Sequence, residues 1–165
     1  MSAQQTFEQI AQKHDAMIRR IAASHEAEIH LAEELVQEIY FAIWRALPSF
    51  RGEASLRTFV ARIATNRSVT HVARALKSAP PLELSEQLEA PGANPETQAI
   101  AVDRQTRLIT AVRALPLAYR QPVLLTLEGL TPKEIADSLG ITTNAVSIRL
   151  SRAKELLRAL LGDRS

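Results

Sequence analysis

A proline-rich stretch in the middle of the chain limits how its 165 residues can fold. Half of the eight prolines fall within the segment APPLELSEQLEAPGANPE, namely Pro80, Pro81, Pro91 and Pro95. The same segment carries four glutamates and no aromatic residue, and such a composition does not build a packed core. We therefore predict an acidic, flexible linker at 77–94 that separates a first domain at 1–76 from a second domain at 95–165.

Composition limits the classes of protein to which the chain can belong. Hydrophobic residues make up 46% of the sequence, which is enough for both domains to bury a core. Cysteine is absent, which excludes a disulfide framework and thiolate metal sites and fits a reducing compartment. No apolar run resembles a signal peptide or is long enough to cross a bilayer, so we expect a cytoplasmic protein without membrane insertion.

Hydrophobic periodicity predicts that both domains are helical, which gives an all-α fold class. Near the N-terminus, one stripe of positions recurs at spacings of three and four and predicts a single amphipathic helix: Phe7, Ile10, Ala11, His14, Ile18 and Ile21. We expect His14 to be a hydrogen-bonded core histidine, because no acidic residue or histidine is spaced to share a metal ion with it. The other histidines are scattered, so the sequence predicts no metal and no cofactor.

A helix predicted at 31–47 is apolar around much of its circumference. We expect six of its side chains to be buried: Leu31, Leu35, Val36, Ile39, Ile43 and Leu47. The remaining strip of this helix consists of Glu34, Gln37, Glu38, Phe41 and Arg45. An aromatic ring among charges is either a stray surface phenylalanine or part of a partner-binding surface, and both interpretations stay open at this point.

The segment from Arg57 to Lys77 predicts a helix that carries five basic residues and no carboxylate. In its second half, helical geometry turns one polar group outward: Asn66, Arg67, Thr70, Arg74 and Lys77. Asparagine and threonine can bond base edges while arginine and lysine neutralise phosphates, so this face is typical of nucleic-acid contact. A solvated face is the simpler alternative, although such faces usually mix charges of both signs.

The second domain contains the segment LTPKEIADSLGITTNAVSIRLSRAKELL, which is typical of a helix-turn-helix. Thr131 and Glu134 have the spacing of a capping box, Gly140 fits the sharp turn, and Thr142 caps the following helix. Upstream, another helix is predicted from Arg120 to Glu128, with Pro122 in its first turn.

Inside this motif, Ala136 is small where two helices cross and Val146 points inward. The opposite side of the second helix would enter the major groove of DNA and carries Asn144, Ser147, Ile148, Ser151 and Arg152, with Arg149 and Lys154 nearer the phosphates. No nucleophile with a base, no paired carboxylates and no phosphate-binding loop is present in the sequence, so we do not expect an enzyme. The residues alone therefore indicate a DNA-binding protein.

Two segments of the chain resemble a known family. AEELVQEIYFAIWRALPSFRGEASLRTFVARIATNR is similar to region 2, and LPLAYRQPVLLTLEGLTPKEIADSLGITTNAVSIRLSRAKELL is similar to region 4, of the extracytoplasmic-function (ECF) sigma factors of bacterial RNA polymerase. The resemblance implies a factor that binds core RNA polymerase and directs promoter-specific initiation at -10 and -35 elements. The alternative is a stand-alone helix-turn-helix regulator whose N-terminal helices sense a ligand or dimerise.

The resemblance also implies partners for the strip on the 31–47 helix. In that family this helix docks on the clamp helices of the largest polymerase subunit, which makes Glu34, Gln37, Glu38, Phe41 and Arg45 candidate core-binding residues. The flap of the second-largest subunit is a second implied contact, and promoter DNA is the third partner. Members of the family are commonly held by an anti-sigma factor, so such a partner is also implied.

For the -10 element, the resemblance assigns the non-template strand to Asn66, Arg67, Thr70 and Arg74. It further implies that the loop SFRGEAS forms a pocket for a base flipped from the melting duplex, through Phe50, Arg51, Gly52, Glu53 and Ser55. The alternative for Phe50 is a ring that packs into the core of the first domain.

For the -35 element, the resemblance assigns the reading helix to Thr143, Asn144, Ser147, Ile148, Arg149, Ser151, Arg152 and Lys154. Ser147 stands where the family usually has a basic residue, and Ile148 stands where it usually has a small polar one. The family's common -35 sequence therefore need not apply to this chain, and Ile148 could contact a thymine methyl instead.

Overall fold

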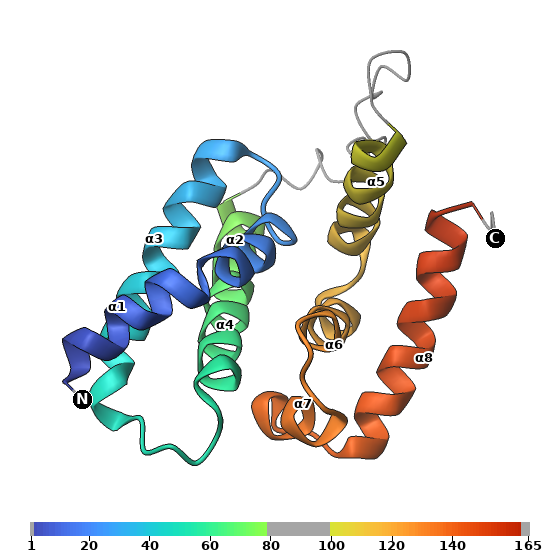
Figure 1. Ribbon diagram of the computed structural model, residues 1–165. Helices are drawn as coiled ribbons and strands as arrows, with labels where there is room; N and C mark the ends of the chain where they lie inside the picture. The colour runs from blue at the N-terminus through green and yellow to red at the C-terminus, as the bar shows by residue number, and fades with distance from the viewer. Residues whose placement is uncertain (1, 79–99, 163–165) are drawn as a thin grey trace.

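The computed structural model describes residues 2–78 and 100–162, and these residues form helices and no strand, which confirms the all-α prediction (Figure 1). In chain order the helices are α1 (Ala3–Lys13), α2 (Asp15–Ala23), α3 (Ile29–Ala46), the short 3-10 helix η1 (Leu47–Ser49), α4 (Leu56–Ser78), α5 (Ile100–Ala114), α6 (Leu117–Leu127), α7 (Pro132–Leu139) and α8 (Thr143–Leu160). Helix α4 continues through the first two residues of the predicted linker, Lys77 and Ser78. The rest of that linker lies outside the described residues, as do the first residues of the predicted second domain.

Helices α1 to α4 form the first group, in which α2, α3 and α4 pack on one another. Five of the six predicted core residues of α3 and η1 are buried: Leu35, Val36, Ile39, Ile43 and Leu47. Leu31 contradicts the prediction, since it is 41% exposed. It lies in the first turn of α3, where Ile29 is 80% exposed, so this turn lies outside the buried cluster.

The single N-terminal helix predicted from the stripe is wrong, because the chain bends at His14. His14 leaves the helical conformation, with φ −119° and ψ 6°, and it caps both α1 and α2. Asp15 begins α2, where its carboxylate accepts hydrogen bonds from Arg19 and from the hydroxyl of Tyr40. After the bend, α2 packs on α3, and α1 contacts α3 through the ring of Phe7, which lies against Tyr40 and Trp44. Ile10, Ile18 and Ile21 are buried in the core, as the stripe predicted.

Helices α5 to α8 form the second group, and α7 and α8 make the predicted helix-turn-helix. The Thr131 hydroxyl accepts from the Glu134 backbone N–H, and the Glu134 carboxylate accepts from the Thr131 N–H, so the capping box is confirmed. Gly140 has φ +68°, a left-handed conformation that glycine adopts without strain. Thr142 caps α8 by accepting from the N–H of Ala145.

Helix α6 differs from its prediction. It begins at Leu117 rather than Arg120, so Pro122 lies inside the helix instead of in its first turn. An internal proline removes one backbone hydrogen bond and normally disfavours a helix. Here Pro122, Val123 and Leu124 are all buried, and burial of apolar side chains stabilises the helix against the cost of that lost bond.

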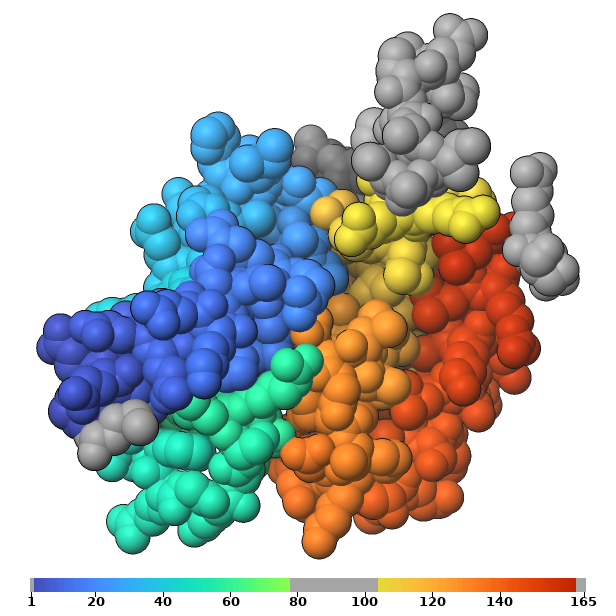
Figure 2. All heavy atoms as spheres, viewed as in Figure 1, coloured from blue at the N-terminus to red at the C-terminus, as the bar shows by residue number. Residues whose placement is uncertain are grey.

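The two helix groups touch each other along a continuous seam (Figure 2). One buried cluster includes residues of the first group, such as Val60 and Ala64, together with Leu125, Leu130 and Ile135 of the second group. A smaller cluster holds α5, α6 and α8 together. The nucleic-acid faces predicted from sequence therefore belong to two helix groups that are in direct contact in this structure.

Candidate nucleic-acid and polymerase interfaces

The first half of α8 presents the face predicted to enter the major groove. Of the eight predicted residues, Arg149 is half-buried. The other seven are exposed: Thr143, Asn144, Ser147, Ile148, Ser151, Arg152 and Lys154. Val146 and Ala153 on the other side are buried and fix the rotation of the helix. Burial of one side and exposure of the other thus place the predicted side chains on an accessible surface.

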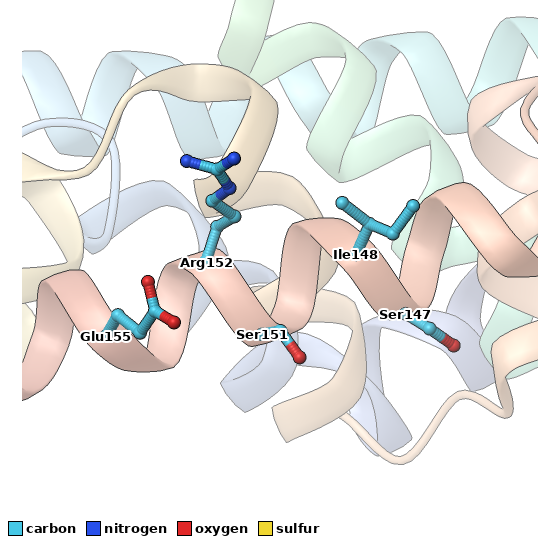
Figure 3. A pocket seen from close by; sticks show the side chains of 5 residues that line it. All are labelled: Ser147, Ile148, Ser151, Arg152 and Glu155. Carbon is cyan, nitrogen blue, oxygen red and sulfur yellow. The ribbon is translucent and has the colours of Figure 1, made fainter.

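A shallow hollow on this face is lined by five side chains that all come from α8: Ser147, Ile148, Ser151, Arg152 and Glu155 (Figure 3). Figure 3 shows Ile148 and Arg152 on the same side of the helix. The hollow combines an apolar contact, two hydroxyls, a guanidinium and a carboxylate, which are groups that can read base edges. The sequence-based prediction did not include Glu155. Its position three residues after Arg152, on the same side of the helix, could have indicated it.

On α4, the four residues predicted to contact the -10 strand lie along one side of the helix in its second half. Asn66 and Arg74 are exposed, whereas Arg67 and Thr70 are half-buried. The Thr70 hydroxyl donates a hydrogen bond to the backbone carbonyl of Asn66 at 3.1 Å, so its proton is used within α4. The hydroxyl oxygen can still accept a hydrogen bond from a base.

The loop between η1 and α4 combines anchored and exposed side chains. The Phe50 ring is half-buried and lies 4.6 Å, centroid to centroid, from the ring of Phe59 on α4. Gly52 has φ +75° and lets the chain turn. The Ser55 hydroxyl accepts from the Thr58 N–H and donates to the Thr58 hydroxyl, while Arg51 and Glu53 are exposed.

The strip on α3 predicted to bind a partner is exposed along its whole length. Phe41 is 59% exposed, and the guanidinium of Arg45 lies 5.7 Å from the centre of its ring. Trp44, which was missed from the sequence, is 44% exposed and packs edge-on against Phe7. Its spacing of three from Phe41 was the signal, and the two rings enlarge the apolar part of this surface.

The histidines differ in burial and in hydrogen bonding. His25 is buried, its Nδ1 bonds the Ile21 carbonyl at 2.8 Å, and burial lowers its pKa to about 4. His14 is half-buried, its Nδ1 has no hydrogen-bond partner, and burial lowers its pKa. The expected hydrogen bond of His14 is therefore not formed through that nitrogen. Within the described residues, no cluster of three or more potential metal ligands occurs.

Comparison with known families matches both helix groups. Residues 10–77 match the family described as Sigma-70 region 2, and residues 105–157 match Sigma-70, region 4. Among curated proteins, the chain is similar to RNA polymerase sigma factor NccH of Alcaligenes xylosoxydans xylosoxydans, with 29% identity over 96% of this chain and 88% of NccH. It is also similar to the ECF RNA polymerase sigma-E factor of Escherichia coli K12, with 28% identity over 75% of this chain and 70% of that protein.

The chain belongs to the ECF group of the sigma-70 family. As a sigma factor it acts with RNA polymerase in transcription initiation and binds promoter DNA. The match of residues 10–77 to region 2 does not favour the alternative of a sensor or dimerisation module in front of a helix-turn-helix.

Among solved structures, the sigma factor has the fold of RpoE from Bartonella quintana, which was solved in complex with the anti-sigma factor NepR. The TM-score is 0.72 at 20% identity, and the match covers 96% of this chain and 98% of RpoE. No helix in the described part of the chain is long and apolar enough to span a membrane.

Proposed function

We propose that this sigma factor divides its contacts among three surfaces, with residues 1–76 as region 2, residues 77–94 as the linker and residues 95–165 as region 4. The α3 strip of Glu34, Gln37, Glu38, Phe41 and Arg45 binds the clamp helices of the largest polymerase subunit. The exposed Phe41 ring beside charged groups supports this assignment, because aromatic anchors with a polar rim are typical of protein interfaces.

For the -10 element, the second half of α4 follows the non-template strand through Asn66, Arg67, Thr70 and Arg74. The adjacent loop receives a flipped base. Its anchored Phe50 ring forms one wall, the exposed side chains of Arg51 and Glu53 offer hydrogen bonds, and Gly52 and Ser55 shape the backbone. Flipping requires such compensation, since unstacking a base costs about a few kcal/mol.

For the -35 element, the first half of α8 lies in the major groove. The single observation that best supports the proposal is that Ser147, Ile148, Ser151 and Arg152 line one accessible hollow on a correctly capped recognition helix. Arginine pairs with guanine, and an isoleucine can pack on a thymine methyl. Contacts with the phosphates and the flanking bases come from the residues around these four, namely Thr143, Asn144, Arg149 and Lys154.

The remaining partners follow from the same function. Region 4 contacts the flap of the second-largest subunit, the polymerase supplies the catalysis, and the factor itself is not an enzyme. It works in the bacterial cytoplasm, where the polymerase is. An anti-sigma factor belongs to the proposal as well, because a protein of the same fold was solved in complex with one.

Site-specific photocrosslinking tests these assignments. A photoreactive amino acid replaces Ile148, Glu53 or Leu160 in separate variants, and each is assembled with core polymerase on a promoter whose start site is mapped. We expect position 148 to crosslink near -35 and position 53 near -10. Position 160, exposed at the far end of α8, should crosslink at neither element. Crosslinks from position 148 outside the -35 region would refute the assignment of α8.

A further inference from the structure

The contact between the two helix groups is built around one buried carboxylate. Glu128 lies at the end of α6, and its side chain is only 6% exposed. Arg20 of α2 donates two hydrogen bonds to it, from Nη2 to Oε1 at 2.6 Å and from Nε to Oε2 at 3.0 Å. Such a bidentate arginine–carboxylate pair is strongly directional.

A second arginine holds the same residue from α4. The guanidinium of Arg57 donates from Nε and Nη2 to the backbone carbonyl of Glu128 at 2.7 and 2.5 Å. It also lies 3.7 Å from the Glu128 carboxylate. Two arginines of region 2 therefore donate hydrogen bonds to both the side chain and the backbone of Glu128 in region 4.

Three further hydrogen bonds cross the seam. The Thr58 hydroxyl donates to the Glu134 carboxylate at 2.6 Å, and Arg62 donates to the carbonyl of Asp137 at 3.2 Å. In the other direction, Arg113 of α5 donates to the carbonyl of Ala23 at 2.6 Å. These directional hydrogen bonds define one specific arrangement of the two helix groups, which we call the closed arrangement.

In the closed arrangement, the two DNA-binding faces are too close together to reach the -10 and -35 elements at the same time. The -10 and -35 elements are about 25 base pairs apart, which is on the order of 80 Å of duplex. A compact chain of this length is only on the order of 40 Å across. Residues 79–99 could span up to about 70 Å if fully extended, so the chain length permits the groups to separate.

We propose that the seam is an autoinhibitory contact and that Glu128, held by Arg20 and Arg57, is its latch. This inference rests on the proposed function, since closure inhibits only if the two groups must bind separate promoter elements. Closure also engages Arg20, Arg57 and Arg62 with acceptors of region 4, and opening would release these three cations for DNA phosphates.

The geometry of the latch suits a contact that must open. The side chains of Arg20 and Arg57 are 54% and 48% exposed, so water reaches the edge of the seam. Opening returns Glu128 to water, which compensates for the lost pairing, because the burial of a charge is itself unfavourable. Arg57 is also two residues from Ser55, so the latch adjoins the loop proposed to hold the flipped base.

Single-molecule energy transfer on the full chain tests the latch without polymerase. The chain has no cysteine, so dyes can be attached specifically through Gln12→Cys on α1 and Arg158→Cys on α8, both exposed positions. We expect Glu128→Gln to raise the ratio of open to closed molecules by about tenfold, because a hydrogen bond to a charged group is lost. Arg113→Gln, which breaks the seam at another point, should act in the same direction.

The matched control is Glu33→Gln, which breaks the Arg19–Glu33 ion pair inside region 2 and should leave the ratio unchanged. The second measurement is the sigma concentration that gives half-maximal promoter-dependent transcription with core polymerase, which should fall several-fold in Glu128→Gln. Identical energy transfer in wild type, Glu128→Gln and Arg113→Gln would overturn the latch. An open shift without a change in that concentration would overturn the inhibition, whereas a wild type that supports no transcription would refute the proposed function separately.

Discussion

The guanidinium of Arg45 lies 5.7 Å from the centre of the Phe41 ring, on the side of α3 that faces away from the core. A ring held by a cation but left 59% exposed is positioned without being buried. It contributes little to folding and is available as an anchor for a partner.

Replacement of Phe41 by alanine should therefore weaken binding to core polymerase while the fold stays intact. We expect a loss of about 1 to 2 kcal/mol in binding free energy, the range of an interfacial aromatic residue. The measurement is a titration of labelled sigma factor with purified core polymerase. Ile29→Ala is the matched control, because Ile29 is 80% exposed on the same helix but outside the strip. Equal affinities for wild type and Phe41→Ala would remove the strip from the interface.

Replacement of Arg152 by alanine should weaken use of the -35 element by about 1 to 3 kcal/mol, as expected for loss of a base-reading arginine. The measurement compares transcription from one promoter with and without its -35 element. Arg158→Ala on the same helix, outside the hollow, should behave as wild type. If Arg152→Ala lowered transcription equally on both templates, the residue would not read that element.

The helix-turn-helix could be predicted in detail because its signals are local. Thr131, Glu134, Gly140 and Thr142 lie within a few residues of the helix ends that they cap, so sequence spacing alone determines their role. The exposed side of α8 follows from helical geometry in the same way.

What the sequence does not reveal depends on tertiary packing. Glu128 resembles any glutamate at a helix end, and only the position of Arg20 and Arg57 in the other helix group buries it. Similarly, the internal Pro122 is accommodated by buried neighbours that no local pattern discloses. The ring contact of Phe50 with Phe59 depends on the path of the loop, which the sequence left open.

The turn at Gly140 allows a direct test of local conformation. Gly140→Ala should lower the free energy of unfolding by about 1 kcal/mol, because a β-carbon is disfavoured at φ +68°. Space is not the cause, since no heavy atom beyond the adjacent residues of the chain lies within 4 Å of the added carbon. Gly140→Asn should cost less than Gly140→Ala, because asparagine tolerates this conformation better. Urea unfolding measures both variants, and an equal loss for alanine and asparagine would argue against the backbone explanation.

Stability should fall as the pH drops from about 6.5 to 4, and His25 should cause part of the fall. Burial lowers the pKa of His25 to about 4 in the folded protein, whereas the ordinary value is near 6.5. Between these values the unfolded chain binds a proton that the folded protein excludes, so folding loses stability as the pH falls. From pH 7.5 to 5, His25 should account for about 1 to 2 kcal/mol of this loss.

Urea unfolding at these two pH values checks the prediction. His25→Gln should show a smaller loss between them than wild type, and the exposed His30→Gln should lose as much as wild type. A loss in His25→Gln as large as that of wild type would show that His25 does not carry this dependence.

The central claim is that this chain directs RNA polymerase to promoters. It is tested most directly by run-off transcription with purified core polymerase, the sigma factor and a library of upstream regions. We predict transcripts that depend on the added factor and start downstream of a shared pair of -10 and -35 motifs. If core polymerase with the factor yielded no promoter-dependent transcript beyond that of core polymerase alone, the claim would be contradicted.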